Sequence, residues 1–333
     1  MSAPDEATFD EFDWIDQDLK PLAEGVPEAL GLLDDAAVIP GRPGFDLVVT
    51  KDALVAGVHF LPDDPMDLVA RKLLRVNLSD LAAKGAEPYG YFLAVAWPKG
   101  ASRDDRRAFA GGLKQDQAAF GLRLMGGDTV TTPGPLTASA TLLGWVPAGA
   151  AVKRSGARAG DRILVSGAIG DGGLGLRAAQ DNLSALASAD RAWLADRYRL
   201  PQPRTSLAGL LRINAHASAD VSDGLIADAG HIALASAVGM ALDLDRAPLS
   251  DAARRWLAVQ PDRTAALVDL ATAGDDYEIV CTTDHGRVPA MQAQARAAGV
   301  ALTEIGTVVE GGGVSVLCDG AEIAIERSGY RHG

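Results

Sequence analysis

The chain has 333 residues, of which 48% are hydrophobic and 23% charged, a composition typical of a globular protein long enough for two domains with separate cores. A formal net charge of −13 argues against a nucleic-acid partner, because phosphate backbones are bound by basic surfaces. With two cysteines, an acidic N-terminus unlike a signal peptide and no apolar run of membrane length, we expect a cytoplasmic protein without a membrane partner.

The first half of the chain mixes helices and strands in irregular order. We expect helices over residues 8–19, 66–80 and 102–120. We expect strands over residues 30–39, 47–51, 88–97, 122–128 and 136–146. In the helix that begins near Met66, Val69, Leu73 and Val76 are spaced by four and three, which places them on one face.

Asp80 lies four residues after Val76 and so continues the apolar stripe of this helix. A carboxylate on a packed helix face costs several kcal/mol unless a cation or a metal accompanies it. The basic residues Arg71, Lys72 and Arg75 are expected on the solvated faces, whereas Lys84 is one turn from Asp80. A salt bridge to Lys84 and a role in metal or phosphate binding both remain open.

A small, basic and glycine-containing segment, residues 148–161, predicts a boundary between domains 1–150 and 151–333. The second half opens with a strand over 162–167, a glycine-rich turn and a helix that begins near Leu174. A strand and helix follow over 214–236, a strand over 277–282, and finally a helix, a strand and a hairpin. Because helices and buried strands do not alternate regularly, we expect an α+β fold rather than a doubly wound sheet.

Five short segments place aspartates beside small or hydroxyl residues, at strand ends or helix starts. They are Asp34-Asp35, Thr50-Lys51-Asp52, Ser79-Asp80, Gly127-Asp128 and Asp220-Val221-Ser222-Asp223. Singly, these have ordinary explanations: a turn for Asp35 or Asp128, and an N-cap for Asp223. Together they favour Mg²⁺, because several ions on a polyphosphate require several carboxylates that converge from different elements.

Other motifs are less specific. The turn SGAIGDGGLG follows a strand and precedes a helix, but it lacks the Lys-Ser/Thr ending of a phosphate loop, so a structural turn is favoured. His59 has no partner at zinc spacing, and both a substrate contact and a hydrogen-bonded loop histidine remain open. Cys281 and Cys318 are interpreted as buried strand residues.

The segments LDDAAVI, TKDALVAGVHF, KLLRVNLSDLAAKGAEP, GGDT, RSGARAGD, PQPR, DVSDGLIAD and GDDYE occur in this order. From about residue 10 to the C-terminus the chain therefore resembles the thiamine-monophosphate kinases, in the superfamily of aminoimidazole-ribonucleotide synthetase, selenophosphate synthetase and hydrogenase-maturation ATPases. The resemblance implies a homodimer whose N-terminal mixed sheets pair into a barrel, a C-terminal α/β sandwich-like domain, and ATP between the two domains. It also implies direct in-line phosphoryl transfer from ATP to thiamine monophosphate with several Mg²⁺ ions and no general base.

The resemblance implies roles for residues at matching motif positions. The implied Mg²⁺ ligands are Asp35, Thr50, Lys51 through its main-chain carbonyl, Asp52, Asp80, Asp128, Asp220 and Asp223. The implied ATP contacts are Gly127, Asp128, Arg154 and Ser222. The implied substrate contacts are His59, Asp275 and Arg327.

Three positions depart from the family pattern. Lys51 replaces a hydroxyl residue, Asp275 a longer glutamate, and Arg327 an aromatic residue, for which Tyr330 is a substitute candidate. Two alternative functions keep part of this interpretation: another superfamily synthetase or ligase, and a non-catalytic metal or nucleotide sensor. The absence of cysteine from the glycine-rich N-terminal segment and from SGYRHG argues against selenophosphate synthesis and hydrogenase maturation, respectively.

Overall fold

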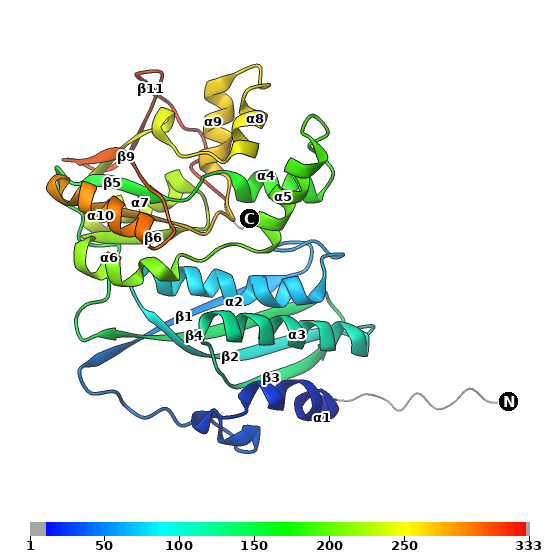
Figure 1. Cartoon of the computed structure of the whole chain (residues 1–333). Coiled ribbons are helices and arrows are strands. Elements are labelled where there is room, and N and C mark those ends of the chain that lie inside the picture. Colours follow the sequence, from blue (N-terminus) through cyan, green and yellow to red (C-terminus); the bar gives the residue numbers. More distant parts are fainter. Residues whose placement is uncertain (1–10, 331–333) are drawn as a thin grey trace. The chain divides into compact units, whose positions relative to one another are not determined.

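The computed structural model describes residues 11–330, which fold into two compact units (Figure 1). Within the described residues, unit one comprises residues 11–77 and 88–145, and unit two comprises residues 78–87 and 146–330. Residues 78–87, which the predicted boundary assigns to the first domain, thus pack with the second unit. No described helix is long and apolar enough to cross a membrane.

Unit one is built on a four-stranded sheet with the order β1-β4-β2-β3, in which β2 and β3 run parallel. The strands are β1 (Phe45–Val55), β2 (Glu87–Pro98), β3 (Leu124–Thr132) and β4 (Thr137–Pro147). The helices α2 (Met66–Ala83) and α3 (Arg103–Phe120) run side by side along the sheet (Figure 1). Trp97 on β2 packs edge-on against Phe109 and Trp14, with ring centroids 5.5 Å apart in each pair.

The predicted solvated positions on α2 are wrong for Lys72 and Arg75, which are only 2% and 5% exposed. Asp116 on α3 is fully buried and binds Arg75 Nε at 2.6 Å and Arg71 Nε at 3.0 Å. Lys72 Nζ donates to the carbonyl oxygen of His59 at 3.0 Å. These charges are buried because partners outside the helix, which its own periodicity does not show, satisfy them.

The N-terminal part of unit one differs most from expectation. The predicted strand over 30–39 is wrong, because Pro27–Leu32 form 3₁₀ turns and the amide of Asp35 bonds to the Asp34 carboxylate at 2.8 Å. Of the predicted helix 8–19, residues 8–10 lie outside the described residues, and α1 (Glu11–Trp14) continues as a π-helical turn over Ile15–Leu19. Strand β1 is longer than predicted, so Asp52 lies within the strand rather than after it.

Unit two contains a seven-stranded mixed sheet with the order β11-β10-β7-β9-β5-β8-β6. Its strands are β5 (Arg162–Ser166), β6 (Ala217–Val221), β7 (Gly239–Asp243), β8 (Glu278–Thr283), β9 (Leu302–Val309), β10 (Gly313–Cys318) and β11 (Ala321–Ile323). Only β7 and β10 pair in parallel; the other neighbours are antiparallel. The expected α+β fold is confirmed.

Helices cover both faces of this sheet. They are α4 (Asp171–Ala179), α5 (Ser188–Arg199), α6 (Ala208–Asn214), α7 (Leu225–Ser236), α8 (Asp251–Leu257), α9 (Arg263–Thr272) and α10 (Val288–Ala297). On β5, Ile163 and Val165 join the core formed with α7, while Leu164 joins the core formed with α10. Burial on both faces explains the continuously apolar strands. Cys281 and Cys318 are unpaired and buried in β8 and β10, as predicted.

Candidate functional site

In unit one, two of the aspartate segments meet at a cavity of about 460 Å³. Asp35 enters it from the bend after the 3₁₀ turns, and Gly127 and Asp128 enter it from the middle of β3. A Cβ atom on Gly127 would lie 1.9 Å from the carbonyl oxygen of Leu93, so only glycine fits at this position. The cavity therefore brings together carboxylates from two segments, and carboxylates are oxygen ligands that a divalent ion prefers.

A further aspartate segment, Thr50-Lys51-Asp52, lies on β1. Thr50 and Asp52 are half-buried and Lys51 is exposed, as the alternation of a strand predicts. Ser139 Oγ donates to the carbonyl oxygen of Asp52 at 2.9 Å, which fixes this part of the strand against β4. The Lys51 side chain thus lies on the face opposite Thr50 and Asp52.

His59 is held in the loop that follows β1. The backbone amide of Val55 donates to Nδ1 of His59 at 3.1 Å. Because Nδ1 accepts this bond, the ring proton of the neutral histidine is on Nε2. His59 is therefore a hydrogen-bonded loop histidine whose second nitrogen is a donor suited to an anionic oxygen.

In unit two, Lys84 is influenced by two of the predicted metal ligands, Asp80 and Asp220. Its Nζ donates to the carbonyl oxygen of Ser218 at 2.9 Å. Burial first, and the nearby Arg154 second, lower the pKa of Lys84, whereas the carboxylates of Asp220 and Asp80 raise it. Asp80 from α2 and Asp220 from β6 thus act on one ammonium group, although they are far apart in the sequence.

The Asp220-to-Asp223 segment ends without the predicted cap. The N-cap of α7 is Gly224, with φ +121° and no side-chain cap, so the N-cap alternative for Asp223 is wrong. Instead, Oδ2 of Asp228 accepts from the amides of Ser222 at 3.0 Å and Asp223 at 3.1 Å. A carboxylate from the first turn of the helix organises the loop and leaves the Asp223 side chain out of the capping role.

Asp228 was not among the predicted site residues. It is 1% exposed, and among the described residues no hydrogen-bond donor reaches its Oδ1. Burial first, and Asp223 second, raise the pKa of Asp228 to about 7. Asp223, Asp228 and His231 present three ligand atoms within 4.8 Å of one another. An unsatisfied buried carboxylate oxygen beside a second carboxylate fits a cation.

Two further groups of metal-binding residue types occur within residues 11–330, and both are internally paired. His216 Nδ1 lies 2.9 Å from Asp161, and its Nε2 lies 3.4 Å from Asp284. Asp245, beside Cys318, binds the guanidinium of Arg263 at 2.6 Å. Neither group resembles a prepared metal site.

Asp275 lies in a strained segment beside Ser222. Asp275 has φ +68° and Tyr277 has φ +51°, and a non-glycine residue in such a region costs about 1–3 kcal/mol. The amide of Asp275 donates to the carbonyl oxygen of Ser222 at 2.9 Å, and the hydroxyl of Tyr277 donates to Oδ1 of Asp275 at 3.1 Å. A predicted substrate contact and a predicted ATP contact are therefore joined through the main chain.

Arg154, a predicted ATP contact, and Arg327, a predicted substrate contact, both lie in unit two. Arg154 acts electrostatically on both Lys84 and Asp228, which places it beside the aspartates of this unit. Arg327 is exposed, and its Nε donates to the carbonyl oxygen of Gly329 at 2.9 Å. The amide of Tyr330 donates to the carbonyl oxygen of Asp223 at 2.9 Å, so the C-terminal segment is tied to the same loop.

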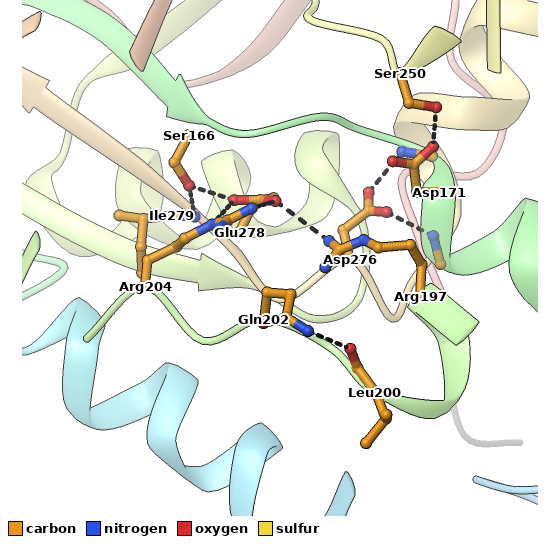
Figure 2. A network of polar contacts seen from close by, with 12 residues as sticks. Ser166, Asp171, Arg197, Leu200, Gln202, Arg204, Ser250, Asp276, Glu278 and Ile279 are labelled. Atoms are coloured by element: carbon orange, nitrogen blue, oxygen red, sulfur yellow. Dashed lines mark hydrogen bonds and ion pairs between the residues drawn. The ribbon is translucent and has the colours of Figure 1, made fainter. Parts of the chain in front are cut away.

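The glycine-rich turn is structural, as predicted. Oδ2 and Oδ1 of Asp276 accept from the amides of Gly170 at 2.7 Å and Gly172 at 2.8 Å (Figure 2). These are the amides at the start of α4, which a bound phosphate would otherwise use. Burial raises the pKa of Asp276 well above its ordinary value. The protein's own carboxyl group thus occupies the two amides to which a phosphate would bind.

Glu278, two residues later, anchors the same segment to the end of β5 and to the PQPR segment. Its carboxylate accepts from Arg204 Nε at 2.6 Å, from Arg197 Nη2 at 3.4 Å and from Ser166 Oγ at 2.6 Å (Figure 2). The motifs PQPR and GDDYE belong to the family resemblance, but the sequence predicts no role for Arg204, Asp276 or Glu278. The run of acidic residues Asp275, Asp276 and Glu278 indicates buried polar contacts, but their partners are distant in the sequence and cannot be identified from it.

Comparison with known proteins gives matches over nearly the whole chain. Residues 33–146 match the AIR synthase related protein N-terminal domain, and residues 158–319 match the corresponding C-terminal domain. A thiamine-monophosphate kinase from Caulobacter vibrioides is 55% identical over 332 residues, which cover 100% of this chain and 93% of that protein.

Two solved structures are similar over comparable lengths. The thiamine-monophosphate kinase from Stenotrophomonas maltophilia superimposes with a TM-score of 0.82 and 39% identity, covering 94% of this chain and 98% of that one. AaThiL complexed with AMPPCP and TMP superimposes with a TM-score of 0.77 and 28% identity, covering 98% of this chain and 97% of that one.

Proposed function

The chain belongs to the AIR synthase related family and, within it, to the thiamine-monophosphate kinases, and we propose that it phosphorylates thiamine monophosphate with ATP. The products are thiamine diphosphate and ADP. The observation that carries this proposal is the 55% identity to a thiamine-monophosphate kinase over the full chain. The ATP analogue AMPPCP and TMP in the similar AaThiL structure support the choice of both substrates.

The proposed chemistry is direct transfer. A phosphate oxygen of thiamine monophosphate attacks the γ-phosphorus of ATP, and the bond from that phosphorus to the β,γ-bridging oxygen breaks, releasing ADP. The attacking oxygen is already largely deprotonated at neutral pH, so the chain need not supply a general base. Its contribution is positioning and charge neutralisation.

Neutralisation is necessary because both substrates are anions. Two unit charges 4 Å apart repel by about 4 kcal/mol at an effective dielectric constant of about 20. When bound, Mg²⁺ supplies that neutralisation, and the carboxylates of this chain are the hard oxygen ligands it prefers. The unsatisfied Oδ1 of buried Asp228 beside Asp223 supports a cation in unit two. The proposed ligands are Asp35, Thr50, the main chain of Lys51, Asp52, Asp80, Asp128, Asp220 and Asp223.

The proposed substrate contacts use groups of fixed geometry. Gly127 and Asp128 line the cavity of unit one, Arg154 offers positive charge, and Ser222 lies in the loop held by Asp228. We assign these residues to ATP. Nε2 of His59 donates to the phosphate of thiamine monophosphate, while Asp275 and Arg327 contact the remainder of that molecule.

Assembly and location are part of the same proposal. We propose a homodimer in which the four-stranded sheets of two copies pair into a barrel, residues 1–150 serving dimerisation and Mg-ATP binding and residues 151–333 completing the site. The family resemblance supports the dimer, and the low cysteine content and acidic charge support a cytoplasmic location without nucleic-acid or membrane partners.

The deciding experiment measures ADP release and thiamine diphosphate formation with ATP and thiamine monophosphate, with and without Mg²⁺. We expect both products in equal amounts and only when Mg²⁺ is present. ADP release that does not depend on thiamine monophosphate would favour another synthetase of the superfamily. Binding of nucleotide without turnover would favour the sensor.

A further inference from the structure

Asp276 has no part in the proposed reaction, yet it is among the most tightly held side chains of unit two. It is 1% exposed, and its two carboxylate oxygens bond to the amides of Gly170 and Gly172 at 2.7 and 2.8 Å. These amides are more than a hundred residues away in the sequence and begin α4. The Asp276 carboxylate thus joins the segment 274–277 to the glycine-rich turn (Figure 2).

The same segment is held from a second side by the loop of the predicted ATP contact. The amide of Asp275 donates to Ser222 and the amide of Tyr277 donates to Val221, at 2.9 and 2.8 Å. The main chain is therefore fixed by one loop, while the side chain of Asp276 is fixed by another.

This double attachment matters because Asp276 lies between two strained residues. Asp275 and Tyr277 have φ values of +68° and +51°, in the left-handed region that non-glycine residues adopt only when their surroundings impose it. The main chain on both sides of this segment is closely packed. A Cβ atom on Gly172 would lie 2.3 Å from the carbonyl carbon of Asp275, and one on Gly274 would lie 2.6 Å from the carbonyl oxygen of Ser222.

We propose that Asp276 is a positioning residue for thiamine monophosphate: by binding the two amides of the glycine-rich turn, it fixes Asp275 in the left-handed conformation that presents its carboxylate to the substrate. The inference rests on the proposed function and on the assignment of Asp275 as a substrate contact. Asp276 itself touches no substrate and acts through Asp275. The turn that resembles a phosphate loop serves as its anchor.

The first test is Asp276→Asn, which keeps the size of the side chain. The amide oxygen still accepts one bond, but the amide nitrogen meets the second main-chain donor as another donor, so one attachment is lost. We expect the KM for thiamine monophosphate to rise about tenfold, as for the loss of one well-placed hydrogen bond. The KM for ATP and kcat are expected to change by less than about threefold. An equal rise in both KM values, or none, overturns the proposal.

A double-mutant cycle separates positioning through Asp275 from a general loosening of unit two. Asp275→Ala removes the carboxylate that Asp276 is proposed to place. In that background, Asp276→Asn is expected to add less than about twofold to the KM for thiamine monophosphate, because coupled residues are not additive. A full tenfold addition shows that Asp276 acts elsewhere and overturns the proposal.

Gly172→Ala provides an independent variant if Asp276→Asn does not fold. It leaves Asp276 unchanged and displaces the main chain of Asp275 from the other side. We expect the same selective rise in the KM for thiamine monophosphate, and an unchanged value overturns the proposal. Asp181→Asn is the control: its side chain is exposed just after the last residue of α4, and the substitution is expected to leave both KM values unchanged.

Failure of this inference is distinguishable from failure of the proposed function. If the unaltered protein forms no thiamine diphosphate, the proposed function fails. If it forms thiamine diphosphate while the variants show no selective change, only the role of Asp276 fails.

Discussion

The ammonium of Lys84 donates a hydrogen bond of 2.9 Å to the carbonyl oxygen of Ser218, two residues before Asp220. Asp80, four residues before Lys84 on α2, is the second carboxylate that acts on this ammonium. Helix α2 and strand β6 therefore carry aspartates that act on one partly buried cation. The positive charge of Lys84 offsets the repulsion between the two carboxylates, which come from distant segments of the chain.

Lys84→Met removes this cation while keeping most of the unbranched side chain. The carbonyl oxygen of Ser218 loses the donor of Lys84, and Asp80 and Asp220 lose the charge between them. We expect the free energy of unfolding in urea to fall by about 1–3 kcal/mol. Lys114→Met, on the exposed side of α3, is the control and should stay within about 0.5 kcal/mol of the unaltered protein. Equal effects of the two substitutions would contradict the structural role of Lys84.

Asp80→Asn tests the proposed metal role. The substitution keeps size and removes one negative charge, so we expect thiamine diphosphate formation to fall by at least about a hundredfold, the usual effect of deleting a group that stabilises the transition state electrostatically. The thermal unfolding midpoint should remain within a few degrees. Asp63→Asn, an exposed residue before the same helix, should retain activity. An Asp80→Asn enzyme that is fully active at ordinary Mg²⁺ would exclude the metal role.

Asp171 predicts a specific pH dependence of stability. It is 1% exposed, and burial, opposed by the hydrogen bond from Ser250, raises its pKa from 3.8 to about 6. Between pH 3.8 and 6, Asp171 is therefore protonated in the folded state and ionised in the unfolded state. The stabilising contribution is complete below pH 3.8 and disappears as the pH rises through 6. The size of the effect is about 3 kcal/mol.

Asp171→Asn cannot ionise and so escapes this loss. Relative to the unaltered protein, we expect the variant to gain about 2 kcal/mol of unfolding free energy between pH 4 and pH 7, measured by urea titration at each pH. Asp181→Asn, exposed at the other end of α4, provides the comparison. A difference between Asp171→Asn and the unaltered protein that does not vary with pH would show that Asp171 titrates in its ordinary range.

Asp116 tests the buried charges of unit one. Asp116→Ala leaves the guanidinium of Arg75, whose side chain is 6% exposed, without its carboxylate partner. Loss of one member of a buried ion pair costs about 3–5 kcal/mol, which urea unfolding would detect. Asp104→Ala removes a 4.0 Å pair with Arg107 in which both side chains are exposed, and should cost less than about 1 kcal/mol. A small effect at Asp116 would contradict its role as the centre of this cluster.

Local patterns in the sequence predicted several of the regular elements, but not α5, α6, β7, α8 or α9. The spacing of Val69, Leu73 and Val76 predicted α2, and Ser102 begins α3 with a capping box to Asp105. Alternation along β1 separated Lys51 from Thr50 and Asp52. These features depend on residues a few positions apart, which is why they can be read without coordinates.

Where a prediction was wrong, a side chain bonded to a group that the periodic pattern does not reveal, at times a near neighbour and at times a distant residue. The bend at Asp34 replaced a strand because a carboxylate bonds the next amide, and Asp223 does not cap α7 because Asp228 already holds the loop amides. Lys72 is buried because it donates to the carbonyl oxygen of His59, and Arg75 is buried because it forms an ion pair with Asp116.

The amino-acid sequence alone identifies the family and the order of most elements, and it predicts which acidic residues would bind a divalent ion. The tertiary structure decided which of those acids meet: Asp35 with Asp128 at one cavity, and Asp80 with Asp220 at Lys84. It also decided that Asp276 fills the start of α4. The reason is that burial changes the cost of a charge, and burial depends on partners from distant segments that no local pattern contains.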